Sequence, residues 1–180
     1  IISTGEGVDD FEVGNRVLAM TGFGGYSEKI SIPSNRVFKL PDSITFDQAA
    51  AIPVTYGTAY HMLFHLGRIS PGDSVLIHHA AGGVGTAVAQ LCKVAGASIV
   101  IGTASASKKE FVESIGVKFV DRESEDFVKI CKEMTDGKGV HHAIDPVGGS
   151  NLMRSYNSTR RGGKVYFFGA SSAVKGDRRS

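Results

Sequence analysis

A glycine-rich turn between an apolar run and a helix-like segment constrains this chain more than any other feature. Residues 75–78 predict a buried strand, and residues 85–95 predict a helix. The turn between them fits the pattern G-x-G-x-x-G, with Ala80 at the first position, Gly82 at the second and Gly85 at the third. In that order, these small residues allow a tight turn, the approach of a pyrophosphate, and close packing of the helix on the strand. Together with the N–H groups of a helix start, they predict a dinucleotide site.

The rest of the chain after this turn alternates between strand-like and helix-like segments with short connections. Such alternation predicts an α/β fold in which a parallel, doubly wound Rossmann sheet carries helices on both faces. The sheet would have five strands, whereas the complete fold usually has about six. Since the chain also lacks an initial methionine, we expect a piece that is truncated at both ends. The predicted strands are 75–78, 98–101, 117–120, 140–144 and 164–168, and the predicted helices are 85–95, 107–115, 126–134 and 150–159.

The first part of the chain has a different, β-rich character. Short strands are predicted over 13–20, 27–32 and 37–40, around glycine-rich turns. A helix then begins with Thr45 as a candidate N-cap and continues over residues 56–66. We expect two parts, a β-rich unit and a dinucleotide-binding domain.

The composition narrows the classes of partner. Hydrophobic residues make up 42% of the 180 positions, which is enough for a globular core. The net charge of +2, without a basic stripe, argues against nucleic acid as a partner. No apolar run reaches the roughly 20 residues of a transmembrane helix. The two cysteines, Cys92 and Cys131, match no metal-ligand spacing and indicate a reduced compartment, so we expect a cytoplasmic protein.

A wider set of positions around the turn carries a family resemblance. These positions are Gly72, Asp73, Leu76, Ala80, Ala81, Gly82, Gly83, Gly85, Gln90 and Lys93. They resemble the signature of the quinone oxidoreductases and ζ-crystallins, the zinc-free branch of the medium-chain dehydrogenase/reductase family. Residues 102–108 and 145–150 resemble the synaptic vesicle membrane protein homologues within that branch.

The resemblance covers essentially the whole chain and implies its organisation. Residues 1–52 would be the C-terminal part of a GroES-like catalytic domain, and residues 53–180 an incomplete NADP-binding Rossmann domain. The resemblance also implies a homodimer in the intact protein and a small carbonyl or quinone as substrate. Peripheral association with vesicle or mitochondrial outer membranes is left open.

The residues after the second and third strands predict NADPH as the cofactor. An NAD site usually has an acidic residue at the end of the second strand, and residues 100–105 contain none. Ser105 and Lys108 would accept a 2′-phosphate there, and Arg122 follows the third strand with a guanidinium that can fork onto the same group. The alternative is that Lys108 and Arg122 are solvated surface charges.

Further cofactor contacts are implied by the resemblance alone. Gly102 would line the adenosine pocket, Thr58 would lie near the nicotinamide, and residues 168–170 would face the nicotinamide after the fifth strand. The alternatives are a helical threonine and core aromatics. The complete predicted cofactor site is Thr58, Ala81, Gly82, Gly83, Val84, Gly85, Gly102, Ser105, Lys108, Arg122, Phe168, Gly169 and Ala170.

The sequence contains little that indicates a metal site or a hydrolytic active site. The zinc-dependent relatives place a cysteine ligand in the segment that corresponds to residues 53–57 and a four-cysteine lobe after the strand near Val17; neither is present. His61 and His65 stand four residues apart on a helix but have no acidic third ligand nearby. No G-x-S-x-G elbow occurs. We therefore expect no metal, and no catalytic residue can be named.

The predicted reaction is hydride transfer from NADPH to a quinone or an α,β-unsaturated carbonyl, with the cofactor carrying the chemistry. A different class remains open, because the vesicle-protein resemblance also fits a non-enzymatic module that binds NADPH as a regulatory signal. An enoyl reductase of fatty-acid or polyketide type would share the same glycine turn.

Overall fold

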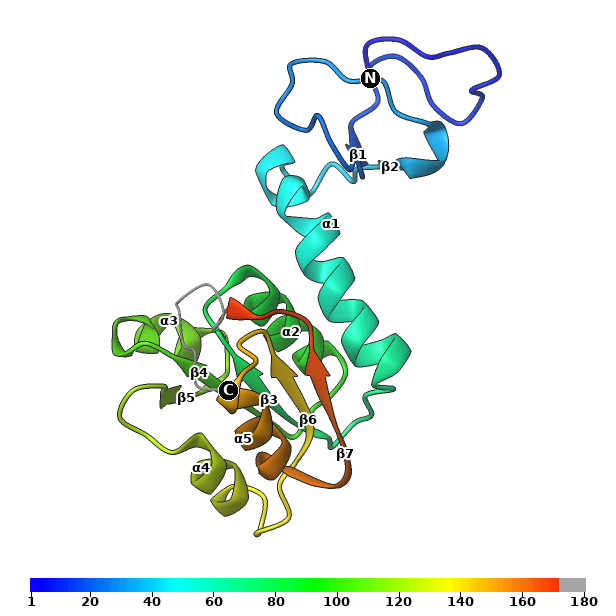
Figure 1. Cartoon of the computed structure of the whole chain (residues 1–180). Coiled ribbons are helices and arrows are strands. Elements are labelled where there is room, and N and C mark those ends of the chain that lie inside the picture. Colours follow the sequence, from blue (N-terminus) through cyan, green and yellow to red (C-terminus); the bar gives the residue numbers. More distant parts are fainter. Residues whose placement is uncertain (172–180) are drawn as a thin grey trace. The chain divides into compact units, whose positions relative to one another are not determined.

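The computed structural model of the chain, in which residues 1–171 are described, contains two compact units (Figure 1). The first is Ile1–Gly57, and the second begins at Thr58. This division lies a few residues beyond the predicted boundary at residue 52. Assignment of the two parts to a GroES-like and an NADP-binding domain remains a prediction. No helix in the described part of the chain is both long and apolar enough to cross a bilayer.

The N-terminal unit contains little regular structure. Strand β1 (Val17–Ala19) pairs antiparallel with β2 (Val37–Lys39), and a short 3-10 turn, Ser34–Arg36, precedes β2. The strand predicted over residues 27–32 is wrong, since these residues are irregular and mostly exposed. Alternating side chains do not make a strand unless a neighbour takes up the backbone hydrogen bonds, and none of the described strands lies beside this segment.

Helix α1 (Phe46–Tyr60) starts at the predicted N-cap. The Thr45 hydroxyl oxygen accepts from the Gln48 N–H at 3.2 Å, and the Gln48 side-chain oxygen accepts from the Thr45 N–H at 3.0 Å. This reciprocal capping box satisfies two N–H groups that a helix start would otherwise leave unpaired. The helix runs past Pro53 into a π-helical segment, His61–Leu66, so the two predicted helical stretches are one.

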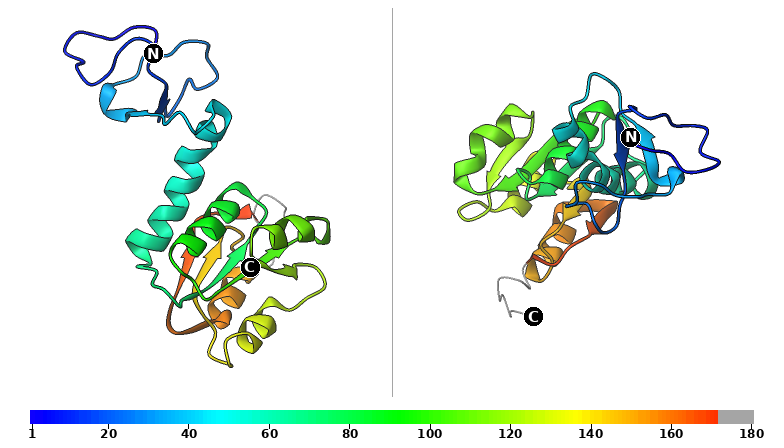
Figure 2. Two further views of the ribbon diagram at one scale, coloured as in Figure 1. Left: turned by 180° about the vertical axis from the view of Figure 1, so that it is seen from behind. Right: turned by 90° about the horizontal axis from the view of Figure 1, so that it is seen from above.

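The second unit is built on a five-stranded parallel sheet in the order β5-β4-β3-β6-β7, which confirms the Rossmann prediction. The strand order reverses between β3 and β6, and ligands of such sheets bind in the crevice at that point. Helices α2 and α3 cover one face and α4 and α5 the other (Figures 1 and 2). The strands are β3 (Ser74–His78), β4 (Ile99–Ala104), β5 (Lys118–Asp121), β6 (Val140–Asp145) and β7 (Thr159–Phe167). The helices are α2 (Gly83–Val94), α3 (Lys109–Ser114), α4 (Phe127–Glu133) and α5 (Ser150–Ser158), with a 3-10 turn (Ala106–Lys108) before α3.

Strand β7 begins earlier than residue 164, where it was predicted to start. Thr159 already pairs with Val140, and the register then shifts before Lys164 pairs with His142. Gly162 has φ +74, a backbone conformation that favours glycine. The intervening residues resemble a turn in sequence, whereas in the structure they bulge within the strand.

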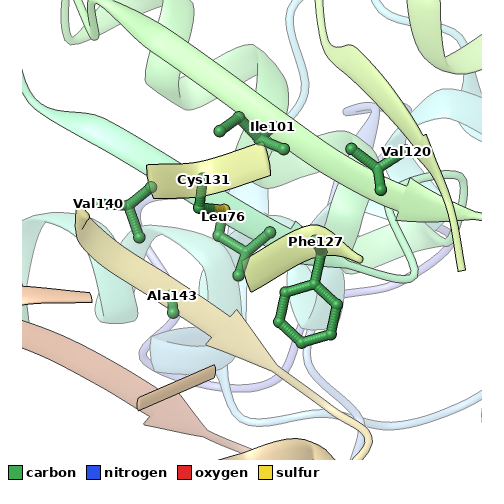
Figure 3. Packing of buried hydrophobic residues seen from close by; sticks show 7 residues of the cluster. All are labelled: Leu76, Ile101, Val120, Phe127, Cys131, Val140 and Ala143. Atoms are coloured by element: carbon green, nitrogen blue, oxygen red, sulfur yellow. The ribbon is translucent and has the colours of Figure 1, made fainter. Parts of the chain in front are cut away.

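One apolar cluster joins four strands to helix α4, as Figure 3 shows. It consists of Leu76, Ile101, Val120, Phe127, Cys131, Val140 and Ala143. Cys131 is a free thiol within this cluster, and Cys92 is a second free, buried thiol on α2. Burial raises the pKa of each thiol to about 12, so both cysteines stay protonated and act as small apolar residues.

Candidate dinucleotide-binding site

The glycine turn leaves β3 through an unusual backbone conformation and is held by two hydrogen bonds. His79, the first residue after the strand, has φ +54. The Ala80 N–H donates to the Thr103 carbonyl of β4 at 3.0 Å, and the Gly82 N–H donates to the His79 carbonyl at 2.8 Å. The turn is therefore fixed to the neighbouring strand before the helix begins.

Gly85 has the packing role that its place in the motif predicts. A Cβ at this position would lie 2.4 Å from the His79 carbonyl oxygen and 2.8 Å from Ala80 Cα. Both are backbone atoms and cannot rotate away, so the residue must be glycine for α2 to approach the turn this closely. Gly82 is exposed, and a Cβ there would lie 3.1 Å from the His79 oxygen. Its role beside a pyrophosphate remains a prediction.

The start of helix α2 is suited to a phosphate group. Gly82 is the N-cap and, having no side chain, gives no cap to the first turn. The N–H groups of Gly83, Val84 and Gly85 occupy positions that have no partner within a helix, and they lie at its positive end. Gly83 is exposed, while Ala81 and Val84 are half-buried. Gly82 and Gly83 add no side chain at this helix start, which is what the approach of a pyrophosphate requires.

The loop after β6 lies across the point where the strand order reverses, and a buried carboxylate shapes it. One oxygen of Asp145 accepts from the N–H groups of Val147 at 2.7 Å and Gly148 at 3.0 Å. The other accepts from Asn151 at 3.0 Å and Ser155 at 2.6 Å. Asp145 is fully buried, and these four bonds satisfy its charge. Asp145 was not among the predicted site residues, although an Asp that precedes Pro-Val-Gly-Gly is a signal for an Asx-type turn.

The residues after β7 pack against this loop. The Phe168 N–H donates to the Asp145 carbonyl at 3.2 Å, and a Cβ on Gly169 would lie 3.1 Å from the Pro146 carbonyl oxygen. Phe168 and Ala170 are exposed. Phe168, Gly169 and Ala170 therefore adjoin the β6 loop, and their contact with a nicotinamide remains a prediction.

The structure brings Ser105, Lys108 and Arg122 to one edge of the sheet. The Arg122 N–H donates to the Ala104 carbonyl at 3.0 Å, and the Lys108 N–H donates to the Ser105 carbonyl at 2.9 Å. The side chains of Lys108 and Arg122 are exposed. These three residues follow β4 and β5, where the sequence placed them, and a shared phosphate contact remains a prediction.

Acidic residues that the sequence analysis did not weigh lie at the same edge. Arg122 forms an exposed ion pair with Glu123 at 3.4 Å. Asp121 accepts from the Glu123 N–H at 3.0 Å and from the Ser124 hydroxyl at 2.9 Å. The Glu123 N–H and then the Ser124 hydroxyl lower the pKa of the Asp121 carboxyl. Exposed pairs of this kind are weak, so Arg122 can exchange Glu123 for a stronger partner.

Gly102 and Thr58 are two further predicted cofactor contacts, and the structure explains the residue type only of Gly102. Gly102 is buried in β4, where a Cβ would lie 2.5 Å from Val117 and 2.6 Å from the Ala80 side chain. Its glycine is explained by this packing, and the adenosine contact remains a prediction. Thr58 is half-buried in α1, and its place beside a nicotinamide is likewise untested.

The histidines on the π-helical segment do not gather a metal site. The rings of His61 and His65 stack with centroids 5.0 Å apart. Within residues 1–171 no three side chains of His, Cys, Asp or Glu are grouped closely enough to hold an ion. The expectation that the protein uses no zinc stays a prediction.

Known proteins match this chain along its whole length. The human synaptic vesicle membrane protein VAT-1 homolog is 41% identical over 181 residues, which cover 100% of this chain and 46% of that protein. Among solved structures, the Escherichia coli quinone oxidoreductase in complex with NADPH has a TM-score of 0.87 and 36% identity, covering 95% of this chain and 53% of that one. CurK enoyl reductase has a TM-score of 0.86 and 34% identity, covering 98% and 55%.

The chain thus spans about half the length of the relatives it matches. The family model described as zinc-binding dehydrogenase matches residues 83–177, more than half of the chain and including the start of α2. With its sheet order and glycine turn, the chain belongs to the zinc-binding dehydrogenase family, on the branch that resembles the quinone oxidoreductases.

Proposed function

We propose that the protein is an NADPH-dependent oxidoreductase that transfers hydride to a quinone or an α,β-unsaturated carbonyl without zinc. The observation that carries this proposal is the close approach of Gly85 to the glycine turn, at the point where the strand order reverses. In this geometry the first N–H groups of α2, which have no partner within the helix, would be donors for a pyrophosphate. The likeness to an NADPH-bound quinone oxidoreductase supports the same cofactor.

The chain's own residues divide the binding of such a cofactor between them. The N–H groups of residues 83–85 would hold the pyrophosphate. Ser105, Lys108 and Arg122 would hold the 2′-phosphate, since no acid stands in the segment after β4 and Arg122 would exchange its exposed pair with Glu123 for the phosphate. Opposite charges at that edge would make NADPH bind more tightly than NADH.

The chemistry depends on placement. NADPH supplies the hydride when it is bound, and the protein orients it and keeps water away. The backbone of residues 168–170 would face the nicotinamide beside the β6 loop, and Thr58 would approach it from α1. The substrate would be polarised by hydrogen-bond donors, and this chain offers no side chain that we assign as the proton donor.

A non-enzymatic function is the second candidate, favoured by the 41% identity to a protein named for synaptic vesicle membranes. In that case NADPH would act as a signal and would not be turned over. Formation of a homodimer, a cytoplasmic location and peripheral association with membranes are also proposals that rest on the resemblance.

The test is a fluorescence titration of the full-length protein with NADPH and NADH, followed by turnover assays. We expect NADPH to bind at least about 10-fold more tightly, or roughly 1.4 kcal/mol. Equal affinities would contradict the 2′-phosphate pocket, and absence of binding would contradict the whole proposal. Oxidation of NADPH by quinones or enones would support the proposed enzyme. Faster oxidation by an enoyl thioester would indicate an enoyl reductase instead. Binding of NADPH without turnover would favour the non-enzymatic function.

A further inference from the structure

Four buried side chains form a continuous hydrogen-bonded chain beneath the candidate cofactor site. Thr103 of β4 bonds to one ring nitrogen of His78 in β3 at 2.9 Å, and the other nitrogen bonds to the Ser155 hydroxyl of α5 at 3.0 Å. Ser155 bonds in turn to Asp145 at the end of β6 at 2.6 Å. Thr103 and His78 are 3% exposed, and Ser155 and Asp145 are fully buried. This hydrogen-bonded network links three strands and one helix in the interior of the second unit.

The direction of each bond follows from the number of protons available. Ser155 has one hydroxyl proton, and the short bond to the carboxylate of Asp145 uses it. The Ser155 oxygen must therefore accept from Nε2–H of His78. Burial lowers the pKa of His78 to about 4, so the ring is neutral near pH 7 and carries a single proton. Nδ1 then accepts from the Thr103 hydroxyl, and all four groups are satisfied in one arrangement.

This arrangement differs from a Ser-His-Asp catalytic triad. In a triad the histidine accepts the serine proton and the carboxylate holds the histidine. Here the carboxylate takes the proton of Ser155 directly, and the histidine donates to that serine. Because Ser155 is also fully buried, no substrate reaches it. We therefore expect the network to hold parts of the structure in place and not to take part in catalysis.

Both ends of the network terminate on the loops of the candidate site. The carbonyl of Thr103 accepts from the Ala80 N–H of the glycine turn at 3.0 Å. The Asp145 oxygen that does not bond Ser155 accepts from the N–H groups of Val147 and Gly148. Gly148 has φ +70, a backbone conformation that favours glycine.

We propose that the hydrogen-bonded network that links Thr103, His78, Ser155 and Asp145 sets the distance between the glycine turn and the β6 loop. In this network His78 and Ser155 are cofactor-positioning residues. A dinucleotide contacts its pyrophosphate and its nicotinamide at different loops, so an error in their separation weakens both contacts. The identity of the ligand rests on the proposed function, whereas the fixing of the loop does not.

The test compares Ser155→Ala with Ser158→Ala in the full-length protein. Both serines are fully buried on α5, but the Ser158 hydroxyl donates only to the Ser155 backbone carbonyl at 2.7 Å. We expect Ser155→Ala to speed hydrogen exchange at the Val147 and Gly148 amides by about 5-fold without cofactor. We expect it to weaken NADPH binding by a similar factor of about 5. Ser158→Ala should change both by less than about 2-fold, even at an equal loss of thermal stability.

Equal effects of the two variants on exchange and on binding would overturn the proposal, as would unchanged exchange in Ser155→Ala. A nitrogen-15 NMR measurement on the unsubstituted protein tests the bond directions separately and does not depend on a variant that folds. The Nε2–H form of His78 is expected, and the Nδ1–H form would contradict the network. If the protein binds neither NADPH nor NADH, the proposed function fails, while the exchange and tautomer results still decide whether the network fixes the β6 loop.

Discussion

Replacing Gly85 with alanine tests the central feature of the candidate site. The added Cβ would lie 2.4 Å from the His79 carbonyl oxygen and 2.9 Å from that of Ala80. The His79 oxygen already accepts the Gly82 N–H at 2.8 Å, so it cannot move without breaking the turn. The first turn of α2 must therefore shift away from β3, and the N–H groups that it presents shift with it.

The magnitude follows from two opposing terms. Alanine is favoured over glycine in a helix by about 1 kcal/mol. Forcing a methyl group into packed surroundings costs about 1–3 kcal/mol, and contacts with backbone atoms belong at the upper end. The net loss of stability is therefore about 2 kcal/mol. A displaced phosphate cradle should weaken NADPH binding by a similar free energy, which corresponds to roughly 30-fold.

Urea denaturation and NADPH titration of the full-length Gly85→Ala protein measure the two quantities. Gly57→Ala is the matched control, since Gly57 lies within α1 and a Cβ there meets nothing within 4 Å. The control should be neutral or more stable by up to about 1 kcal/mol and should bind NADPH normally. If Gly85→Ala bound NADPH as tightly as the unsubstituted protein, the close approach of α2 would not govern the site and the reasoning would fail.

Three other predictions concern charge, pH and thiol chemistry. Glutamate in place of Lys108 and Arg122 should weaken NADPH binding by at least about 10-fold and leave NADH binding nearly unchanged, and equal losses in the two titrations would exclude a 2′-phosphate contact. The pKa of His78 is about 4 when folded and 6.5 when unfolded, so only the unfolded state gains a proton between these values. Stability should therefore be level above pH 6.5 and fall by up to roughly 3 kcal/mol as the pH drops to 4, and urea titrations across that range should show a flatter profile for His78→Gln. Cys131, with a pKa of about 12, should resist a thiol reagent at pH 8 until the protein unfolds, and rapid labelling of the native protein would contradict its burial.

The parallel sheet could be predicted from the sequence because its signals are local. Strands β3 and β4 are short, largely apolar runs, and the helices between the strands have their own periodicity. The glycine turn is equally local, since residues 80–85 determine both the tight turn and the close helix start. The N-cap at Thr45 was predictable for the same reason, whereas its reciprocal bond with Gln48 was found only in the structure.

Other elements depended on neighbouring strands that the local sequence does not identify. The strand predicted over residues 27–32 did not form, because no strand in the described part of the chain lies beside it. Strand β7 begins earlier than predicted because the bulge between its Val140 and His142 pairs depends on pairing with β6.

The sequence by itself determined the fold class, the position of the phosphate turn and the small residues that the turn requires. Only the tertiary structure decided which polar groups support it. His78 and Ser155 are 77 residues apart, and nothing in the spacing predicts their hydrogen bond. A turn is specified by conformational limits on neighbouring residues, whereas a buried polar group must find whichever partner the completed fold places within reach, because an unpaired group in the interior costs too much free energy.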